Sequence, residues 1–165
     1  MRKIWLAGGC FWGVEAYFQQ LKGILDTKVG YGQGEIDNPT YQQVCSGTTG
    51  YTEVCKLTYD EVTMPLEKIL EHFFRIINPT TLNRQGADQG TQYRTGVYYG
   101  EEAEKSVIAN FIHKMQAYHT DNIVVEVEPV RNFHLAEEYH QQYLQNTVGG
   151  YCHVNLMLAR PEEKK

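Results

Sequence analysis

The amino-acid sequence predicts an α/β or α+β two-layer sandwich, because short strand-like segments alternate with helical segments and long loops. At 165 residues, the chain is long enough for one domain with its own hydrophobic core. We expect a single domain over 1–158 and a short charged tail over 159–165 that frays. The expected strands are 2–7, 24–30, 52–59, 96–99 and 123–127. The expected helices are 11–20, 65–77, 101–118 and 136–145.

The elements of the first half follow from local patterns. The apolar run 4–7 predicts the first strand, and a Gly-Gly pair separates it from the first helix. Residues 30–50 are rich in Gly, Asn, Pro and Thr, which predicts a loop with one helical turn at 41–45. Residues 52–59 alternate in the manner of a strand. One face of that strand carries Glu53, Cys55, Leu57 and Tyr59.

The second half shows helical periodicity twice. The segment 65–77 begins with a proline, which suits a first helical turn, and carries an apolar stripe. A polar loop is expected over 78–92 before the strand at 96–99. The helix at 101–118 again has one apolar face, and Pro129 is expected to end the strand that follows it. The apolar faces of the two helices are Leu66, Ile69, Leu70, Phe73 and Ile77, and Val107, Ile108, Phe111, Ile112 and Met115.

The composition argues against several kinds of partner. Lys and Arg number 15 against 20 Asp and Glu, and the charges are interspersed, so no basic stripe is present to hold a nucleic acid. No apolar run reaches about 20 residues, the length of a membrane span, or about 7–15 residues near the N-terminus, the length of a secretory signal. We expect a cytoplasmic monomer that binds neither nucleic acid nor membranes. The four cysteines form no C-x-x-C pair and no H-E-x-x-H is present, so we expect no metal and no cofactor.

The segment 8–13, Gly-Gly-Cys-Phe-Trp-Gly, has the clearest chemical content. It places Cys10 at a helix N-terminus, where free backbone N–H groups and the helix dipole favour an anion. The thiolate is the reactive form of cysteine, so this position favours a nucleophile. Phe11 and Trp12 would add a hydrophobic wall beside the sulfur. The alternative is a buried structural cysteine, because free cysteine is among the most buried residue types.

Other residues carry two interpretations each. If the face of Glu53 points inward, burial raises the pKa of its carboxyl, which then holds a proton near neutrality as a general acid must. If the strand frays there, Glu53 is simply solvated. Tyr41 and Tyr93 lie in polar loops and either donate a hydrogen bond to an oxygen or merely pack. Asp88 is either a turn residue or part of a site, and Cys152 is either an inert tail cysteine or a mobile reactive one.

These motifs resemble the A-type peptide methionine sulfoxide reductases, which act on the S-epimer of methionine sulfoxide. The resemblance rests on Gly-Cys-Phe-Trp-Gly at 9–13 and on four stretches in the same order, at 38–47, 50–53, 88–94 and 139–144. It spans nearly the whole chain. It implies an α+β two-layer sandwich with a ferredoxin-like βαβ core and long flanking loops, which periodicity alone does not predict.

The resemblance also implies a role for each residue around the substrate. Cys10 attacks the sulfur of a free or protein-bound methionine sulfoxide, and the rings of Phe11 and Trp12 hold its methyl group. Glu53 is the acid near the sulfoxide oxygen. Tyr41 and Tyr93 lie beside Glu53 and assist it, and Asp88 belongs to the substrate pocket.

For the cysteines, the resemblance implies a division of labour. Cys152 converts the sulfenic acid of Cys10 into a Cys10–Cys152 disulfide, which thioredoxin then reduces. Relatives often carry a further cysteine beyond this position, and none follows Cys152 here. Cys45 matches a non-essential cysteine of the family, and Cys55 is expected to be structural.

Three other functions share some of these features. A thiol peroxidase would also use a sulfenic acid and a resolving cysteine, but has less use for an acid beside a methyl pocket. A methionine-binding or redox-sensing module would need no turnover. A cysteine hydrolase would need a histidine base, and nothing in the spacing singles out His119, His134 or His140.

Overall fold

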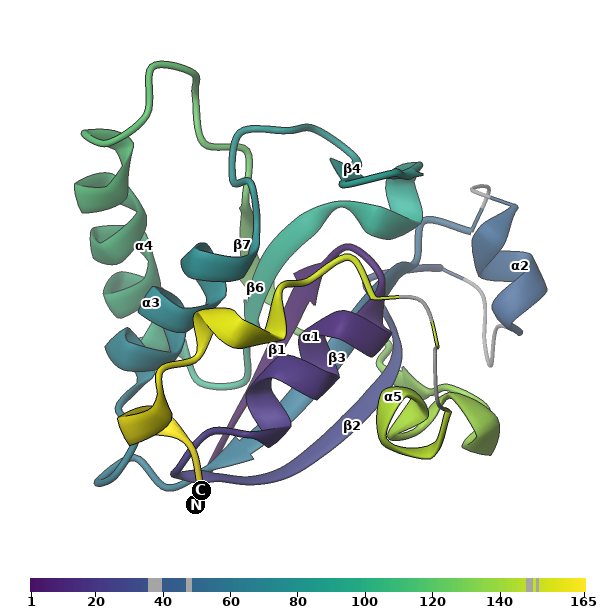
Figure 1. Ribbon diagram of the computed structural model, residues 1–165. Helices are drawn as coiled ribbons and strands as arrows, with labels where there is room; N and C mark the ends of the chain where they lie inside the picture. Colours follow the sequence, from purple (N-terminus) through teal and green to yellow (C-terminus); the bar gives the residue numbers. More distant parts are fainter. Residues whose placement is uncertain (36–39, 47–48, 148–149, 151) are drawn as a thin grey trace.

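The computed structural model describes residues 1–35, 40–46, 49–147, 150 and 152–165. Its centre is a six-stranded sheet in the order β7-β6-β1-β3-β2-β8, shown in Figure 1. The strands are β1 (Arg2–Gly8), β2 (Ile24–Gly32), β3 (Thr52–Tyr59), β6 (Thr95–Tyr99), β7 (Glu126–Pro129) and β8 (His134–Leu135). The α-helices are α1 (Phe11–Gln19), α2 (Tyr41–Cys45), α3 (Leu66–Ile76), α4 (Glu102–Gln116) and α5 (Tyr143–Asn146). The chain is therefore an α+β protein, as the sequence predicts.

The four central strands form two interleaved units. Strand β1 pairs antiparallel with both β3 and β6, and β2 pairs antiparallel with β3. Helix α1 therefore connects β1 to a parallel strand, β2, with β3 between them. Helix α3 connects β3 to β6 in the same way, with β1 between them. The pair β6–β7 is parallel and extends the sheet at one edge.

The hydrophobic core lies between the sheet and its helices. Figure 1 shows α1 and α3 across one face of the sheet and α4 beside α3, where the rings of Phe74 and Phe111 meet edge to face. Cys55, Leu57 and Tyr59 point into this core, as their alternation predicts. Each large apolar side chain buried in this way contributes about 1.5–3 kcal/mol. The opposite face of the sheet has a smaller cluster: Ala7, Val54 and Tyr98 with Trp5, Val130 and Phe133.

The expected strand at 123–127 is wrong in position. Strand β7 begins at Glu126 and includes Pro129. The residues before it are held instead by the end of α4, because the Gln116 side chain accepts a hydrogen bond from the Ile123 backbone N–H at 2.9 Å. Pro129 is tolerated because β7 is the edge strand of the sheet.

The expected helix at 136–145 is also wrong. β8 ends just before that segment, which contains a 3-10 turn at Glu138–His140 and the start of the short helix α5. Gln142 adopts a left-handed conformation with φ of 53°, which interrupts any continuous helix. The Gln141 side chain bonds to both the backbone N–H and the C=O of Val29, at 2.9 and 2.8 Å, so it occupies the edge of β2 beyond β8.

The loop expected at 78–92 contains more structure than its sequence suggests. It holds a two-stranded hairpin of β4 (Arg84–Gln85) and β5 (Asp88–Gln89), followed by a 3-10 turn, η1 (Thr91–Tyr93). The buried Gln85 side chain bonds to both the N–H and the C=O of Asn78, at 2.9 and 2.7 Å. These bonds replace regular pairing and keep the hairpin beside the sheet.

The end of the chain does not fray as expected. The backbone N–H of Lys22 donates to the Glu163 C=O at 2.9 Å, and that of Lys165 donates to the Gln20 C=O at 2.9 Å. The Glu163 carboxylate lies 2.9 Å from the Arg75 guanidinium and 3.4 Å from His72 Nε2. The last residues are therefore anchored to α1 and α3.

His72 lies at the centre of this anchor. It is fully buried, and its Nδ1 is 2.8 Å from the Tyr17 hydroxyl. Burial, with the nearby Arg75 charge, lowers the pKa of His72 to about 4. The unfolded chain thus binds more protons than the folded one between about pH 4 and 6.5, so stability falls as the pH falls through this window. The Arg75 contact lowers the pKa of Glu163 to about 2, so its contribution is lost only at lower pH.

We predict that His72→Gln reduces the loss of stability on acidification. Between pH 7.5 and pH 5, protonation of His72 in the unfolded chain should cost the wild type about 2 kcal/mol of unfolding free energy. The variant lacks this titrating group. Urea unfolding of both proteins at the two pH values measures the difference, and equal losses in both proteins would contradict the assignment.

Candidate active site

Cys10 lies at the turn between β1 and α1. It is the N-cap of α1, and Gly9 before it has φ of 83°, which favours glycine. A Cβ atom on Gly9 would lie 2.7 Å from the Gln85 Cβ and 2.9 Å from His153 Nε2, so a side chain has no room there. The turn is thus packed between the β4–β5 hairpin and the C-terminal segment, and Cys10 is 7% exposed.

Glu53 faces this turn from β3. It is 1% exposed, and its Oε1 accepts a hydrogen bond from the Phe11 backbone N–H at 3.1 Å. Within the described residues, its Oε2 atom is buried and has no hydrogen-bond partner. Burial, reinforced by Asp88 and opposed by the Phe11 N–H, raises the pKa of Glu53 to about 8. Of the two interpretations of this residue, the structure therefore supports the buried, protonated one.

The Cys10 thiol is not the ready thiolate that the helix N-terminus suggests. Burial raises its pKa well above its usual value, and the charges of Glu53, Asp88 and Cys152 act in the same direction. The hydrogen bond from the Trp12 backbone N–H lowers the pKa of Cys10, but by less than burial raises it. Desolvation exceeds the dipole effect here, because a partial charge at a helix end contributes only about 0.3–2 kcal/mol.

Tyr41, Tyr93 and Asp88 surround Glu53. Tyr41 begins α2, whose N-cap Thr40 forms a capping box with Gln43. Burial raises the pKa of Tyr41 and of Tyr93, and the charge of Glu53 raises both further. Both phenols therefore remain O–H donors at neutral pH. Asp88, in β5, also raises the pKa of Tyr93, which places its carboxylate within the same electrostatic cluster.

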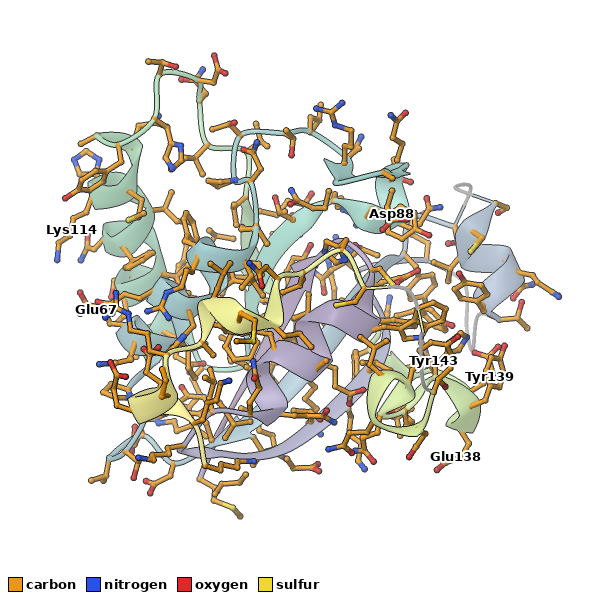
Figure 2. The ribbon with its side chains drawn as sticks, in the orientation of Figure 1. Glu67, Asp88, Lys114, Glu138, Tyr139 and Tyr143 are labelled. Carbon is orange, nitrogen blue, oxygen red and sulfur yellow. The ribbon has the colours of Figure 1, made fainter. Side chains whose placement is uncertain are left out.

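Phe11 and Trp12 occupy different environments. The Phe11 ring is buried, with the rings of Tyr31 and His140 at centroid distances of 5.7 and 5.4 Å. Trp12 is only partly buried and stacks on Tyr143 at 3.8 Å with an interplanar angle of 10°. Its Nε1–H donates to His140 Nδ1 at 3.1 Å. Figure 2 shows Tyr143 and Tyr139 beside α5, with Asp88 above them at the β4–β5 hairpin.

Cys152 lies in the segment that covers the Cys10 turn. His153 Nε2 is 2.9 Å from the Gly8 C=O, and a Cβ atom on Gly13 would lie 3.0 Å from Val154. The Cys152 thiol contacts the Val154 C=O at 3.2 Å, and both Cys10 and Cys152 are free thiols. These contacts place His153 and Val154 directly against the start of α1. Two nearby residues, Gly149 and Tyr151, lie outside the described part of the chain.

The other two cysteines differ from each other. Cys55 is fully buried in the core and is structural, as expected. Cys45 is exposed at the end of α2, and its sulfur accepts a hydrogen bond from the Tyr41 hydroxyl. Cys45 therefore lies on the Glu53 side of the cluster, whereas Cys152 lies on the Cys10 side.

The arrangement does not favour a cysteine hydrolase. The titratable neighbours that affect Cys10 are the carboxyls of Glu53 and Asp88 and the thiol of Cys152, and none of the three candidate bases is among them. His140 uses Nδ1 to accept the Trp12 hydrogen bond, and His134 contacts Tyr51 edge on. Within the described residues, no group of three or more His, Cys, Asp or Glu side chains is placed to bind a metal. No helix in that part of the chain is long and apolar enough to cross a membrane.

Comparison with known proteins gives a consistent result. A family model for peptide methionine sulfoxide reductase matches residues 2–165. This chain belongs to that family. It is 52% identical over 156 residues to the peptide methionine sulfoxide reductase MsrA of Alkaliphilus metalliredigens, covering 94% of this chain and 99% of the relative. The reductase is thus an oxidoreductase of the MsrA type.

Solved structures agree with this assignment. Mxr1 from Saccharomyces cerevisiae in reduced form superposes on the reductase with a TM-score of 0.87 and 40% identity, covering 92% of this chain and 88% of that one. Mxr1 in complex with Trx2 superposes with a TM-score of 0.62 and 28% identity, covering 86% and 84%. Methionine sulfoxide reductase A of Corynebacterium diphtheriae superposes with a TM-score of 0.79 and 29% identity, covering 92% of this chain and 77% of that one.

Sequence reasoning missed the partners that hold Trp12 and the Cys10 turn. No local pattern pairs Trp12 with His140, because 128 positions separate them. The His140 region was recognised only through the resemblance. His153 likewise reaches Gly8 across 145 positions. Such contacts depend on the return of the C-terminal segment over α1.

The buried carboxyl of Glu53 has a measurable consequence for stability. Because its folded pKa of about 8 lies above its unfolded value, the folded state binds the extra proton between about pH 4.5 and 8, and stability falls as the pH rises through this range. We predict that the wild type loses about 3 kcal/mol relative to Glu53→Gln between pH 5.5 and pH 8. Guanidinium unfolding at several pH values measures this. If the unfolding free energies of the wild type and Glu53→Gln change equally with pH, Glu53 is ionised in the folded protein.

Proposed function

We propose that this reductase converts methionine-S-sulfoxide, free or in proteins, into methionine, as a protein-repair reaction after oxidation. The observation that supports this most directly is the buried carboxyl of Glu53, whose Oε2 has no partner within the described residues, close to the Cys10 turn. A protonated acid with a free oxygen suits the polar oxygen of a sulfoxide. A half-buried indole at Trp12 suits its methyl group.

We further propose the architecture and setting in which this occurs. Residues 1–158 act as one catalytic domain with a short charged tail at 159–165. The strand order β6-β1-β3-β2, with α1 and α3 as connections, supports a ferredoxin-like core. We propose that the protein works as a cytoplasmic monomer.

In the first step, Glu53 donates its proton to the sulfoxide oxygen while Tyr41 and Tyr93 donate hydrogen bonds to the same oxygen. The Cys10 sulfur then bonds to the sulfoxide sulfur. The protonated oxygen passes from that sulfur to the Cys10 sulfur as a hydroxyl group, the S–S bond breaks, and methionine leaves with the bonding electron pair. Cys10 is now a sulfenic acid, the reversible first rung of thiol oxidation. The proton lost from the Cys10 thiol returns to Glu53, so charge and protons balance. This proton exchange between Glu53 and Cys10 explains how a thiol of raised pKa reacts. The Cys10 thiol loses its proton only as the sulfoxide oxygen gains one.

The methyl group of the substrate selects the binding mode. Burying one such carbon contributes about 0.8 kcal/mol, and a sulfur–aromatic contact about 0.3–1.5 kcal/mol. We assign the methyl group to the wall of Phe11 and Trp12, and the substrate's polar backbone to Asp88. The methyl group then lies against the rings, the oxygen points to Glu53, and the Cys10 sulfur approaches from a third direction. Together these three directions fix the orientation of the substrate sulfur. This accounts for selectivity towards one epimer.

In the second step, the Cys152 thiol attacks the sulfur of the Cys10 sulfenic acid, which forms a disulfide and releases water. A thioredoxin then reduces the disulfide by thiol–disulfide exchange. The charge of Cys152 affects Cys10, which supports their proximity. The related Mxr1 in complex with Trx2 supports the choice of reductant.

Racemic methionine sulfoxide tests the proposal directly. We predict that the wild type with dithiothreitol consumes only the S-epimer and that Cys10→Ser consumes neither, because a hydroxyl is far less nucleophilic than a thiolate. Chiral chromatography of the remaining sulfoxide measures this. Equal loss of both epimers, or turnover by the variant, would contradict the geometry, and a preference for peroxide would indicate a peroxidase.

We predict that Glu53→Gln lowers the rate of methionine formation by about 10²–10⁴-fold, the usual contribution of a general acid. The amide keeps the shape of the side chain and can still accept the Phe11 hydrogen bond. Single-turnover measurements on prereduced enzyme isolate this step. A loss of less than about threefold would mean that Tyr41 and Tyr93 suffice.

We predict that Cys152→Ser still forms one methionine per enzyme and then stalls with thioredoxin, because no second thiol resolves the sulfenic acid. Dithiothreitol should partly restore turnover by attacking that acid directly. Cys45→Ser is the matched control and should turn over with thioredoxin. If Cys45→Ser stalls while Cys152→Ser does not, then Cys45 is the resolving residue. Peptide mapping for a Cys10–Cys152 link provides an independent measurement.

A further inference from the structure

The ring of Trp12 depends on a short segment that cannot hold its own conformation. Helix α5 has only four residues, well below the length at which an isolated helix is stable. Its first residue, Tyr143, stacks on Trp12, and His140 just before it bonds to the Trp12 indole. The position of the Trp12 ring therefore follows the position of the segment 140–143.

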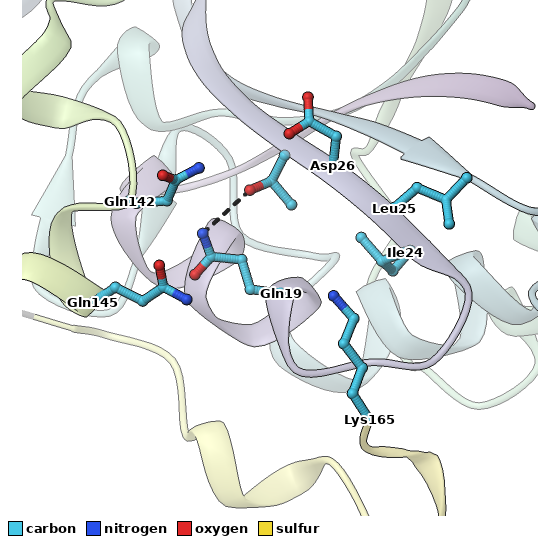
Figure 3. Close-up of a pocket in the computed structure, with 8 residues that line it drawn as sticks. Gln19, Ile24, Leu25, Asp26, Gln142, Gln145 and Lys165 are labelled. Carbon is cyan, nitrogen blue, oxygen red and sulfur yellow. Dashed lines mark hydrogen bonds between the residues drawn. The ribbon is translucent and has the colours of Figure 1, made fainter.

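Packing alone does not hold this segment, because a hollow lies beside it. Figure 3 shows Gln142 and Gln145 facing Gln19 and Asp26 across this hollow. Its volume is about 260 Å³, and Thr27 and Lys165 also line it. It lies on the α5–β2 side of α1 and does not include Cys10 or Glu53. On this side, hydrogen bonds rather than packing hold the start of α5.

Glu15 accepts a hydrogen bond from the residue at the start of α5. It lies on α1, three residues after Trp12, and is 1% exposed. Its Oε1 accepts the Gln142 backbone N–H at 2.7 Å, and its Oε2 accepts the Thr27 hydroxyl at 2.8 Å. Gln142 is the N-cap of α5 and has the left-handed φ of 53°, a conformation that is strained for a residue with a side chain. Burial raises the pKa of Glu15, and the two hydrogen bonds oppose this effect.

We propose that Glu15 is a positioning residue: through Gln142 it fixes α5, and thereby the stacked Trp12–Tyr143 wall against which the substrate methyl group binds. Glu15 does not touch the substrate. The role in binding rests on the function proposed above, whereas the effect on Trp12 does not. Helix α1 thus carries both the Trp12 ring and the Glu15 carboxyl, which positions the Tyr143 ring stacked on Trp12.

The test uses Trp12 as its own reporter. The chain has two tryptophans, so Trp5→Phe leaves Trp12 as the single source of indole fluorescence. In this background we compare Glu15→Ala, Glu15→Asp and Glu15→Gln. Asp keeps the charge but is one methylene shorter, whereas Gln keeps the shape and an oxygen acceptor. Gln19→Ala is the matched control, because Gln19 lies on the same helix, lines the hollow and bonds to Thr27 at 3.3 Å.

We expect acrylamide to quench Trp12 about twofold more strongly in Glu15→Ala and Glu15→Asp, and no change in Glu15→Gln or Gln19→Ala. In single-turnover reactions, the sulfoxide concentration at half-maximal rate should rise about tenfold in the first two variants, the equivalent of one hydrogen bond. The limiting rate should stay within about threefold. If Glu15→Ala fails to fold, Glu15→Asp carries the test.

Unchanged quenching in the Ala and Asp variants would overturn the proposal, as would a fall in limiting rate with unchanged half-saturation. Equal effects in Glu15→Gln would also overturn it, because that side chain retains the acceptor. Failure of the proposed function is distinguishable from these outcomes. In that case the wild type forms no methionine, while the quenching series still decides whether Glu15 positions Trp12.

Discussion

The contact between the Glu53 carboxyl and the Phe11 backbone N–H is the constraint on which the site depends. It joins β3 to the first turn of α1, and it brings an acid that is almost fully buried beside the only thiol at a helix start in the described structure. A carboxyl can occupy such a position only if it keeps its proton or finds donors, and here one oxygen has a donor. The sheet register that positions Glu53 therefore also sets its chemistry.

The remainder of the site is supplied by segments that return from elsewhere in the chain. The C-terminal segment crosses the Cys10 turn through His153, and the final residues are tied to α1 and α3 through Glu163. The segment 140–143 reaches α1 from the other side. The glycines at 9 and 13 allow the C-terminal segment to approach, because a Cβ atom at either of them would collide with or press against His153 or Val154. Helix α1 is thus the common support for the Cys10 turn, the Trp12–Tyr143 stack and the C-terminal segment.

The sequence predicted those elements whose pattern is local. The alternation of residues 52–59 placed Glu53 on the inward face, and the stripe of α3 is buried as expected. The strand near 123–127 and the helix near 136–145 were wrong because tertiary contacts of Gln116, Gln141 and Gln142 decide them. Propensity does not encode these tertiary hydrogen bonds. The state of Cys10 was also mispredicted, since the dipole of α1 is visible in sequence and the desolvation around the thiol is not.

The raised pKa of Cys10 has a consequence for survival of the protein among oxidants. A thiol reacts with peroxides and alkylating agents through its thiolate, and burial keeps both the thiolate fraction and the access low. The same desolvation that delays ionisation therefore shields the sulfur from the conditions that damage methionine elsewhere. The sulfur is thereby shielded from reagents that need an exposed, ionised thiol. In the proposed mechanism the thiol ionises as the bound sulfoxide takes up the proton of Glu53, so the substrate itself makes the thiol reactive.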